Sequence, residues 1–165
     1  MSRVVVDQLL SMLDQSFERS PDAGPTDGWH SLMANLESVG DEDWEWLPAD
    51  GKRTIGHLAI HCGFAMRMYA DRGFGDATLE MADAVFTRTG GEPSKAAVLP
   101  WLREAHGILR DSLVASDDES LGHMRVTHWG ERKTRRWFIV TMIEHNIYHA
   151  GEINHLRALA QKNDK

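Results

Sequence analysis

Residues 134–160 read TRRWFIVTMIEHNIYHAGEINHLRALA, and this run predicts one long helix. At about 100° per residue, one stripe of the helix collects apolar side chains and two histidines, and Glu152 and Ile153 lie on its flanks. The members of the stripe are Phe138, Met142, His145, His149 and Leu156. A helix with such a stripe has to bury it against other helices.

Three more segments have helical spacing. The first covers residues near 3–19, and a shorter piece at about 29–39 continues it after a break rich in proline and glycine. The second runs from Thr54 to about Arg72, and the third from Pro93 or Pro100 to Ala115. Four long helices without convincing β-alternation predict an all-α protein, an up-down four-helix bundle.

The predicted helices are joined by connections of mixed length. Residues 40–51 are acidic and turn-like, and we expect Trp44, Trp46 and Leu47 to fold back onto the core. The link 74–91 is longer than the usual loop, so it is either partly helical or part of a functional rim. Residues 120–133 form a second, irregular link with two histidines and a tryptophan.

Length and charge restrict the class of protein. A chain of 165 residues suits a single domain, 1–165. Its 18 Lys and Arg against 25 Asp and Glu give a net charge of −7, which argues against binding to nucleic acid or anionic membrane. No stretch approaches the roughly 20 apolar residues of a membrane span. The N-terminus lacks a signal-peptide pattern, and the single cysteine, Cys62, excludes an internal disulfide, so we expect a cytoplasmic protein.

Two histidines of the last helix suggest a metal site. His145 and His149 are four residues apart, so their imidazoles lie one turn apart on the same face and can hold one ion. The alternative is that both are ordinary polar residues at a wet rim of the bundle. Uncoordinated imidazoles inside the bundle would need other hydrogen-bond partners.

The second predicted helix offers a third ligand. His61 lies on its apolar side, among Thr54, Leu58, Ala65 and Met68. Three histidines would leave coordination positions open for water or substrate, as a catalytic metal requires. The alternative for His61 is a hydrogen-bonded core histidine.

Two stretches resemble signatures of the DinB-like superfamily of proposed metalloenzymes. Residues 54–61, TIGHLAIH, are similar to its second-helix signature, and residues 142–153, MIEHNIYHAGEI, to its last-helix signature. Residues 101–106, WLREAH, and 29–32, WHSL, are similar to weaker features of the family. The resemblance spans nearly the whole chain, and the two histidine motifs are its specific part.

This resemblance implies one divalent metal ion, zinc or nickel, held by His61, His145 and His149. It implies a metal-dependent enzyme acting on a small molecule, a transferase or hydrolase, with homodimers frequent. Some relatives use a low-molecular-weight thiol such as mycothiol, bacillithiol or glutathione. In the mycothiol-dependent maleylpyruvate isomerases a glutamate stands first in the last-helix pair; this chain has His145 there, which argues against that reaction.

Neighbouring residues suggest further roles. Glu152, about one turn beyond His149, is a candidate general base or hydrogen-bond partner of an imidazole, or an exposed helix carboxylate. His57, one turn before His61, is a candidate proton shuttle or a solvent-facing residue, with a fourth-ligand role less favoured. Cys62 lies about 100° round the helix from His61 and is expected to be a small buried hydrophobe.

Residues of the second link also have two interpretations. The run 131–136, ERKTRR, could attract an anionic substrate or cosubstrate, although a solvated basic turn is the favoured interpretation. Trp129 and Trp137 fill structural contacts or line the approach to the metal.

Two functions therefore compete. One is the metal-dependent enzyme, and the other is a non-catalytic, metal-stabilised binding or stress-response protein. The links 74–91 and 120–133 are longer than minimal bundle turns and favour the enzyme, because they suggest pocket walls.

Overall fold

The computed structural model describes residues 2–18, 31–79 and 94–163. In chain order its elements are α1 (Val4–Phe17), α2 (Leu32–Glu37), α3 (Asp41–Trp44), α4 (Ile55–Phe74), α6 (Lys95–Val114), the 3₁₀ turn η1 (Ser120–Gly122), β1 (Met124–Val126), β2 (Arg132–Thr134) and α7 (Arg135–Asn163). The predicted helices are confirmed with small shifts at their ends.

Local sequence determines where α4 begins and ends. The Thr54 hydroxyl accepts a hydrogen bond from the His57 backbone N–H at 3.1 Å, and the His57 side chain accepts one from the Thr54 N–H at 3.4 Å. This capping box satisfies backbone donors that the first turn of a helix leaves free. At the other end, the Gly75 N–H donates to the carbonyls of Ala70 and Asp71.

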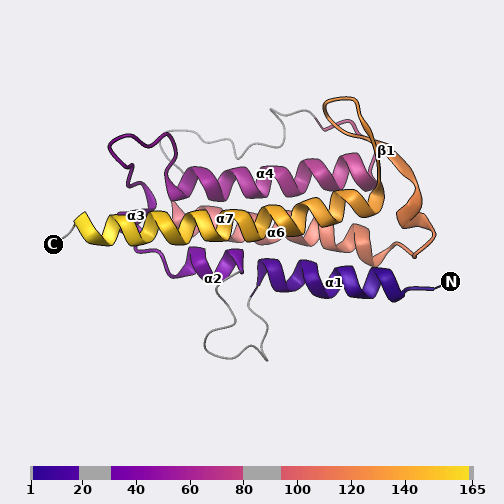
Figure 1. The fold of residues 1–165 in the computed structure, drawn as a ribbon, viewed down its shortest axis with the longest axis horizontal. Helices are drawn as coiled ribbons and strands as arrows, with labels where there is room; N and C mark the ends of the chain where they lie inside the picture. Colours follow the sequence, from indigo (N-terminus) through magenta and orange to yellow (C-terminus); the bar gives the residue numbers. More distant parts are fainter. Residues whose placement is uncertain (1, 19–30, 80–93, 164–165) are drawn as a thin grey trace.

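The long helices pack as a four-helix bundle (Figure 1). α7 packs against α1 and α4, and α6 packs against the same two helices from the other side. α2 follows α1 along the same edge of the bundle and also contacts α7. The all-α, four-helix prediction is confirmed.

The direction of α6 departs from simple up-down alternation. Gly63 of α4 faces Trp101 of α6, and the ends of the two helices meet where Phe74 and Ile108 line one pocket. From the first of these contacts to the second, the residue numbers rise in both helices, so α4 and α6 run parallel. A 20-residue helix is about 30 Å long, so parallel neighbours require a connection able to return along the bundle. The segment between residues 74 and 95 has enough residues to make this return. Residues 80–93 of that segment lie outside the described part of the chain.

Residues 124–134 form a small β-hairpin, although the sequence shows no convincing β-alternation there. β1 and β2 pair antiparallel, with Met124 opposite Thr134 and Val126 opposite Arg132. Gly130 closes the turn with φ of 92°, a left-handed conformation that glycine adopts without strain. Strands of three residues are too short for an alternating pattern to stand out.

The tryptophans of the segment 40–51 differ in burial. Trp44 is buried, and its ring occupies the space beside Gly56 that a side chain there would need. Trp46 is half-buried and Leu47 exposed, so the expected fold-back is confirmed for Trp44, only partly for Trp46 and not for Leu47. Trp29, His30 and most of the link 74–91 fall outside the described residues.

Close packing fixes α4 against α6. A Cβ atom built on Gly63 would collide with the ring of Trp101, so only glycine permits this approach of the two helices. Around this contact the core is aliphatic, with Leu58, Leu102 and Leu109 fully buried. None of the helices in the described ranges has both the length and the apolar character needed to cross a bilayer.

Candidate metal centre

Three histidines meet between α4 and α7. His61 comes from α4, and His145 and His149 lie one turn apart on α7. The Nε2 atoms of His61 and His145 are 3.0 Å apart, and one ring nitrogen from each of the three lies within 4.8 Å of the others. Their ring centroids are 4.4–5.0 Å apart. The ring nitrogens of the three ligands predicted from the sequence therefore lie close together in the folded chain.

The spacing of two of these nitrogens, on His61 and His145, fits a bound ion. Imidazole nitrogens lie about 2.0–2.1 Å from zinc, so two ligands would be roughly 2.9 Å apart at a right angle and roughly 3.4 Å apart at the tetrahedral angle. The 3.0 Å between His61 and His145 falls within that range. Imidazole suits both zinc and nickel, so the donor set is compatible with either metal.

The cluster keeps its imidazoles neutral. Burial, reinforced by the neighbouring rings of His149 and His61, lowers the pKa of His145 to about 3. Burial also lowers the pKa values of His61 and His149, although the Glu152 carboxylate opposes the shift in both. Three neutral rings present lone pairs at neutral pH, which is the protonation state that metal binding requires.

Glu152 orients one of these rings. Its Oε2 lies 2.8 Å from Nδ1 of His149, one turn away on the same helix. The carboxylate accepts a hydrogen bond from the Nδ1–H group, and Nε2 of His149 is then the ring nitrogen with a free lone pair, an arrangement common around metal-binding histidines. By contrast, Nδ1 of His145 is buried and has no hydrogen-bond partner among the residues described. Of the roles that the sequence left open for Glu152, the geometry supports the hydrogen-bond partner.

His57 lies apart from the cluster. Its side chain is exposed and takes part in the capping box at the start of α4. It is not among the residues whose ligand atoms group together. A proton-shuttle role for His57 stays a prediction.

Cys62 is fully buried in the core, as expected for a small hydrophobe. Burial raises the pKa of its thiol, so the side chain stays protonated and unreactive. The cysteine next to His61 is therefore no candidate for a thiolate ligand.

Sequence reasoning missed Arg53. This exposed residue directly precedes the N-cap of α4, and its positive charge contributes to lowering the pKa values of both His61 and His149. The signal available in the sequence was a cation immediately before the helix that carries His61. A charge next to a helix start is common, so the sequence does not single out this one.

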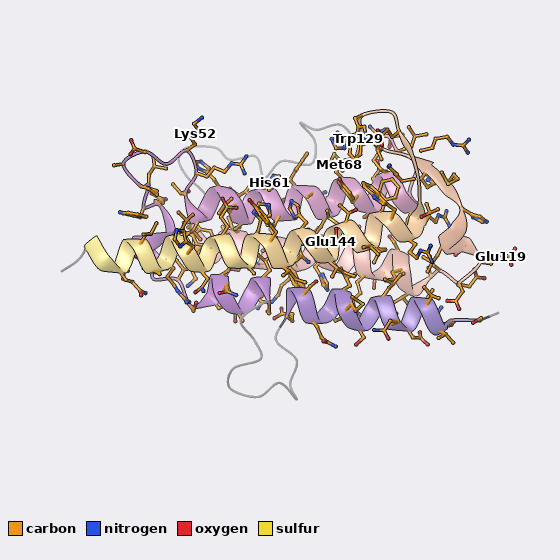
Figure 2. The ribbon with its side chains drawn as sticks, viewed as in Figure 1. Lys52, His61, Met68, Glu119, Trp129 and Glu144 are labelled. Carbon is orange, nitrogen blue, oxygen red and sulfur yellow. The ribbon has the colours of Figure 1, made fainter. Side chains whose placement is uncertain are left out.

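The tryptophans of the second link form an aromatic cluster at the hairpin. The Trp137 ring stacks on Tyr69 at 6.0 Å and meets the Trp129 ring at 5.8 Å. Lys133 lies over Trp137 and pairs with Glu131 at 3.0 Å, so part of the basic run is already neutralised. Tyr69 lies eight residues beyond His61, about 12 Å along the helix. Figure 2 likewise shows Trp129 separated from His61.

A surface pocket of about 330 Å³ lies between α4 and α6. Phe74, Gly75, Thr78 and Leu79 line one side, so the beginning of the link after α4 does form a pocket wall. None of the three clustered histidines lines this pocket. It is therefore distinct from the metal centre.

Comparison with known proteins agrees with this geometry. The model of the DinB superfamily matches residues 26–153, most of the chain and all three clustered histidines. The chain belongs to the DinB superfamily. It also resembles the crystal structure of a DinB-like protein from Bacillus subtilis, with a TM-score of 0.62 and 14% sequence identity over 93% of this chain and 92% of that one. At this identity the likeness shows the DinB fold alone. No curated protein matches the sequence.

Proposed function

We propose that this DinB-superfamily protein is a metal-dependent enzyme that acts on a small molecule, with His61, His145 and His149 as the ligands of one divalent ion. The observation that supports this most directly is the convergence of three neutral imidazoles, two of them with Nε2 atoms 3.0 Å apart. A divalent ion held by three neutral ligands would act as a Lewis acid toward a bound water, thiol or substrate oxygen.

The chain's own residues would prepare that centre. His61 and His145 are half-buried and His149 is buried, so the low-polarity surroundings hold the rings in place and unprotonated. Glu152 fixes the tautomer of His149 and remains partly exposed, with 33% of its side chain accessible. A carboxylate in this position can also exchange a proton with solvent.

The proposed reaction is a transfer or hydrolysis, with a low-molecular-weight thiol as the candidate cosubstrate. Thiolates are soft ligands with high affinity for zinc, and a cationic centre favours the thiolate form. Zinc and nickel are the proposed native metals.

Metal content tests the ligand assignment. Elemental analysis of the purified protein should find about one divalent ion per chain, and the triple variant H61A/H145A/H149A should bind none while keeping its helical circular dichroism. Full metal stoichiometry in a folded triple variant would refute the proposed centre.

Substitution of cobalt tests whether the centre is catalytic or only structural. An enzyme requires an open coordination position, so addition of a thiol should change the visible and near-ultraviolet spectrum of the cobalt-loaded protein. A metal that only stabilises the fold would be closed to added ligands. In that case the spectrum would not change with thiol, and chelation would only lower the melting temperature.

A further inference from the structure

The pocket between α4 and α6 is built from one face of each helix and the segment that follows α4. Arg67, Ala70, Asp71 and Phe74 line it from α4, at the spacing that places residues on one helix face. Ile108 and Ser112, one turn apart, line it from α6. The two helices pack along each other (Figure 1), and the segment 75–79 supplies the remaining wall.

The chain holds this wall in place. The backbone N–H of Leu79 donates to Oδ2 of Asp71 at 2.8 Å, and the Gly75 carbonyl accepts a hydrogen bond from Arg125 of the hairpin. Between them, Ala77 has φ of 59°, a left-handed conformation that a residue with a side chain adopts infrequently. Such a backbone persists only where its surroundings fix it. The wall is therefore a formed part of the fold, as in most small-molecule sites.

Part of the pocket surface is apolar and open to solvent. Ala70, Phe74, Leu79 and Ile108 supply this part, and 40% of Ile108 is exposed. Apolar surface in a concave pocket is typical of a ligand site, and the volume of about 330 Å³ lies in the usual range of about 300–1,000 Å³. An apolar group of matching size would gain free energy by covering this surface.

The same pocket carries one charge of each sign. Arg67 and Asp71 lie one turn apart on α4, and no ion pair joins them in the structure. Within the described ranges the Arg67 side chain has no charged partner, whereas Arg103 and Arg110 are paired with carboxylates at 2.9 Å. Asp71 uses Oδ2 for the Leu79 backbone, and its Oδ1 accepts no hydrogen bond from the residues described.

We propose that this pocket binds a free apolar α-amino acid. Arg67 would bind the carboxylate, Asp71 the ammonium group, and the apolar surface around Phe74 and Ile108 the side chain. A ligand with only one charged group would leave the other pocket charge without a partner. Arginine suits a carboxylate because its planar guanidinium can donate two parallel hydrogen bonds. The inference goes beyond the proposed function and does not depend on it, because no clustered histidine lines the pocket.

Three compounds with the same phenyl group test the class of ligand. Phenylalanine has both charged groups, phenethylamine lacks the carboxylate, and 3-phenylpropionate lacks the ammonium. Nuclear magnetic resonance titration of the full-length protein, followed at the backbone amides of the pocket residues, gives a dissociation constant for each. We expect phenylalanine to bind about fivefold more tightly than either analogue, the effect of one partly exposed ion pair.

Two outcomes of this titration would overturn the proposal. One is an analogue that binds as tightly as phenylalanine, because one charge would then be enough. The other is the absence of shifts at the pocket amides with phenylalanine. An amino acid that chelates a metal ion would shift the amides around His61, His145 and His149 instead, so the two sites are read separately.

Substitution of the two charged residues tests their separate roles. Arg67→Gln should weaken phenylalanine about fivefold and leave phenethylamine unchanged, since that compound has no carboxylate. Asp71→Asn should weaken phenylalanine by a similar factor without weakening 3-phenylpropionate. The asparagine keeps an acceptor oxygen for the Leu79 N–H, so the wall is retained. Loss of all three compounds in equal measure would show a damaged pocket and contradict the assigned contacts.

Arg136→Gln and Asp111→Asn are the matched controls, since they remove the same charges from exposed positions outside the pocket. Both should bind phenylalanine as wild type does. Losses equal to those of the pocket variants would show general electrostatic attraction and overturn the proposal. The metal content of the pocket variants should stay at the wild-type value, so failure here and failure of the metal centre are distinguishable.

Discussion

Two regions of this bundle bury histidines in different ways. Between α4 and α7, three imidazoles face one another, and within the described ranges their one carboxylate partner is Glu152 on His149. Between α1 and α6, His106 stacks flat on Phe17, with ring centroids 3.9 Å apart and an angle of 3° between the planes. The difference shows that a buried histidine becomes a candidate ligand through convergence with others, and that burial by itself is not sufficient.

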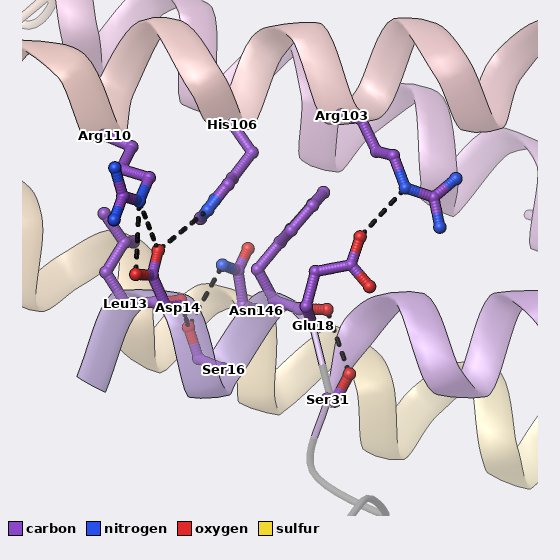
Figure 3. A network of polar contacts seen from close by, with 10 residues as sticks. Leu13, Asp14, Ser16, Glu18, Ser31, Arg103, His106, Arg110 and Asn146 are labelled. Carbon is purple, nitrogen blue, oxygen red and sulfur yellow. Dashed lines mark hydrogen bonds and ion pairs between the residues drawn. The ribbon is translucent and has the colours of Figure 1, made fainter. Parts of the chain in front are cut away.

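The surroundings of His106 are those of a structural contact (Figure 3). Its Nε2 lies 3.4 Å from the Asp14 carboxylate, which Arg110 also holds at 2.9 Å. Nearby, Asn146 is fully buried and donates from its amide to the Ser16 hydroxyl at 3.3 Å. These contacts tie α1 to α6 and α7, and they gather no second imidazole around His106 among the residues described.

Replacing one histidine in each region should distinguish the two regions most clearly. His149→Ala should weaken zinc binding more than about a hundredfold, since loss of an orienting partner alone costs about 10- to 100-fold and loss of the ligand costs more. His106→Gln should leave the affinity within about twofold of wild type. Competition with a chromogenic chelator measures both. Comparable losses in the two variants would remove the distinction between the regions.

The second prediction concerns stability. His106→Ala should lower the free energy of unfolding by about 2–4 kcal/mol, because it leaves a cavity beside Phe17 and removes a stacked ring. The exposed control His155→Ala should change it by less than about 0.5 kcal/mol. Urea denaturation with chelator present measures both values. A His106 variant as stable as the control would show that the stacked contact contributes little.

A fall in pH should lower the free energy of unfolding more through the three-histidine region than through His106. Without metal, His145 stays neutral in the folded state down to a pKa of about 3 but takes up a proton near pH 6.5 when unfolded. The unfolded state therefore binds more protons between these values, so stability is present above pH 6.5 and is lost as the pH falls below it. From pH 6.5 to 5 the loss from His145 should reach about 2 kcal/mol.

His145→Gln should remove this part of the acid sensitivity, and urea denaturation at pH 7, 6 and 5 with chelator would show it. His106 also has a pKa lowered by burial, but the nearby Asp14 carboxylate opposes the shift, so His106→Gln should have the smaller effect. An unchanged pH profile in His145→Gln would mean that the ring is not kept neutral by burial.

The smallest expected effect belongs to Glu152. Glu152→Gln should weaken zinc binding by about tenfold, because the amide is a poorer acceptor for the Nδ1 proton of His149 than the carboxylate. Glu144→Gln is the control: it removes an exposed carboxylate from the same helix and should leave the affinity unchanged (Figure 2). Equal effects in the two variants would point to general charge and not to orientation of His149.

The helices and the three-histidine cluster could be predicted from the sequence, because helical periodicity is a local property. The spacing of His145 and His149 fixed their common face, and His61 lay on the apolar side of its own helix. The parallel direction of α6 could not be predicted, since it depends on the route of the chain between the helices. Arg53 and the stacking of His106 on Phe17 were also missed, because both depend on how distant segments pack.

The contact between Gly63 and Trp101 has a consequence for the metal centre. Gly63 lies two residues from His61, about 200° round α4, so the indole supports the helix from the side opposite the imidazole. The two positions cannot vary independently: a bulkier residue at 63 needs a smaller one at 101. Paired substitutions there offer a way to shift one ligand sideways by small steps and tune the coordination sphere without altering any atom that would touch the ion.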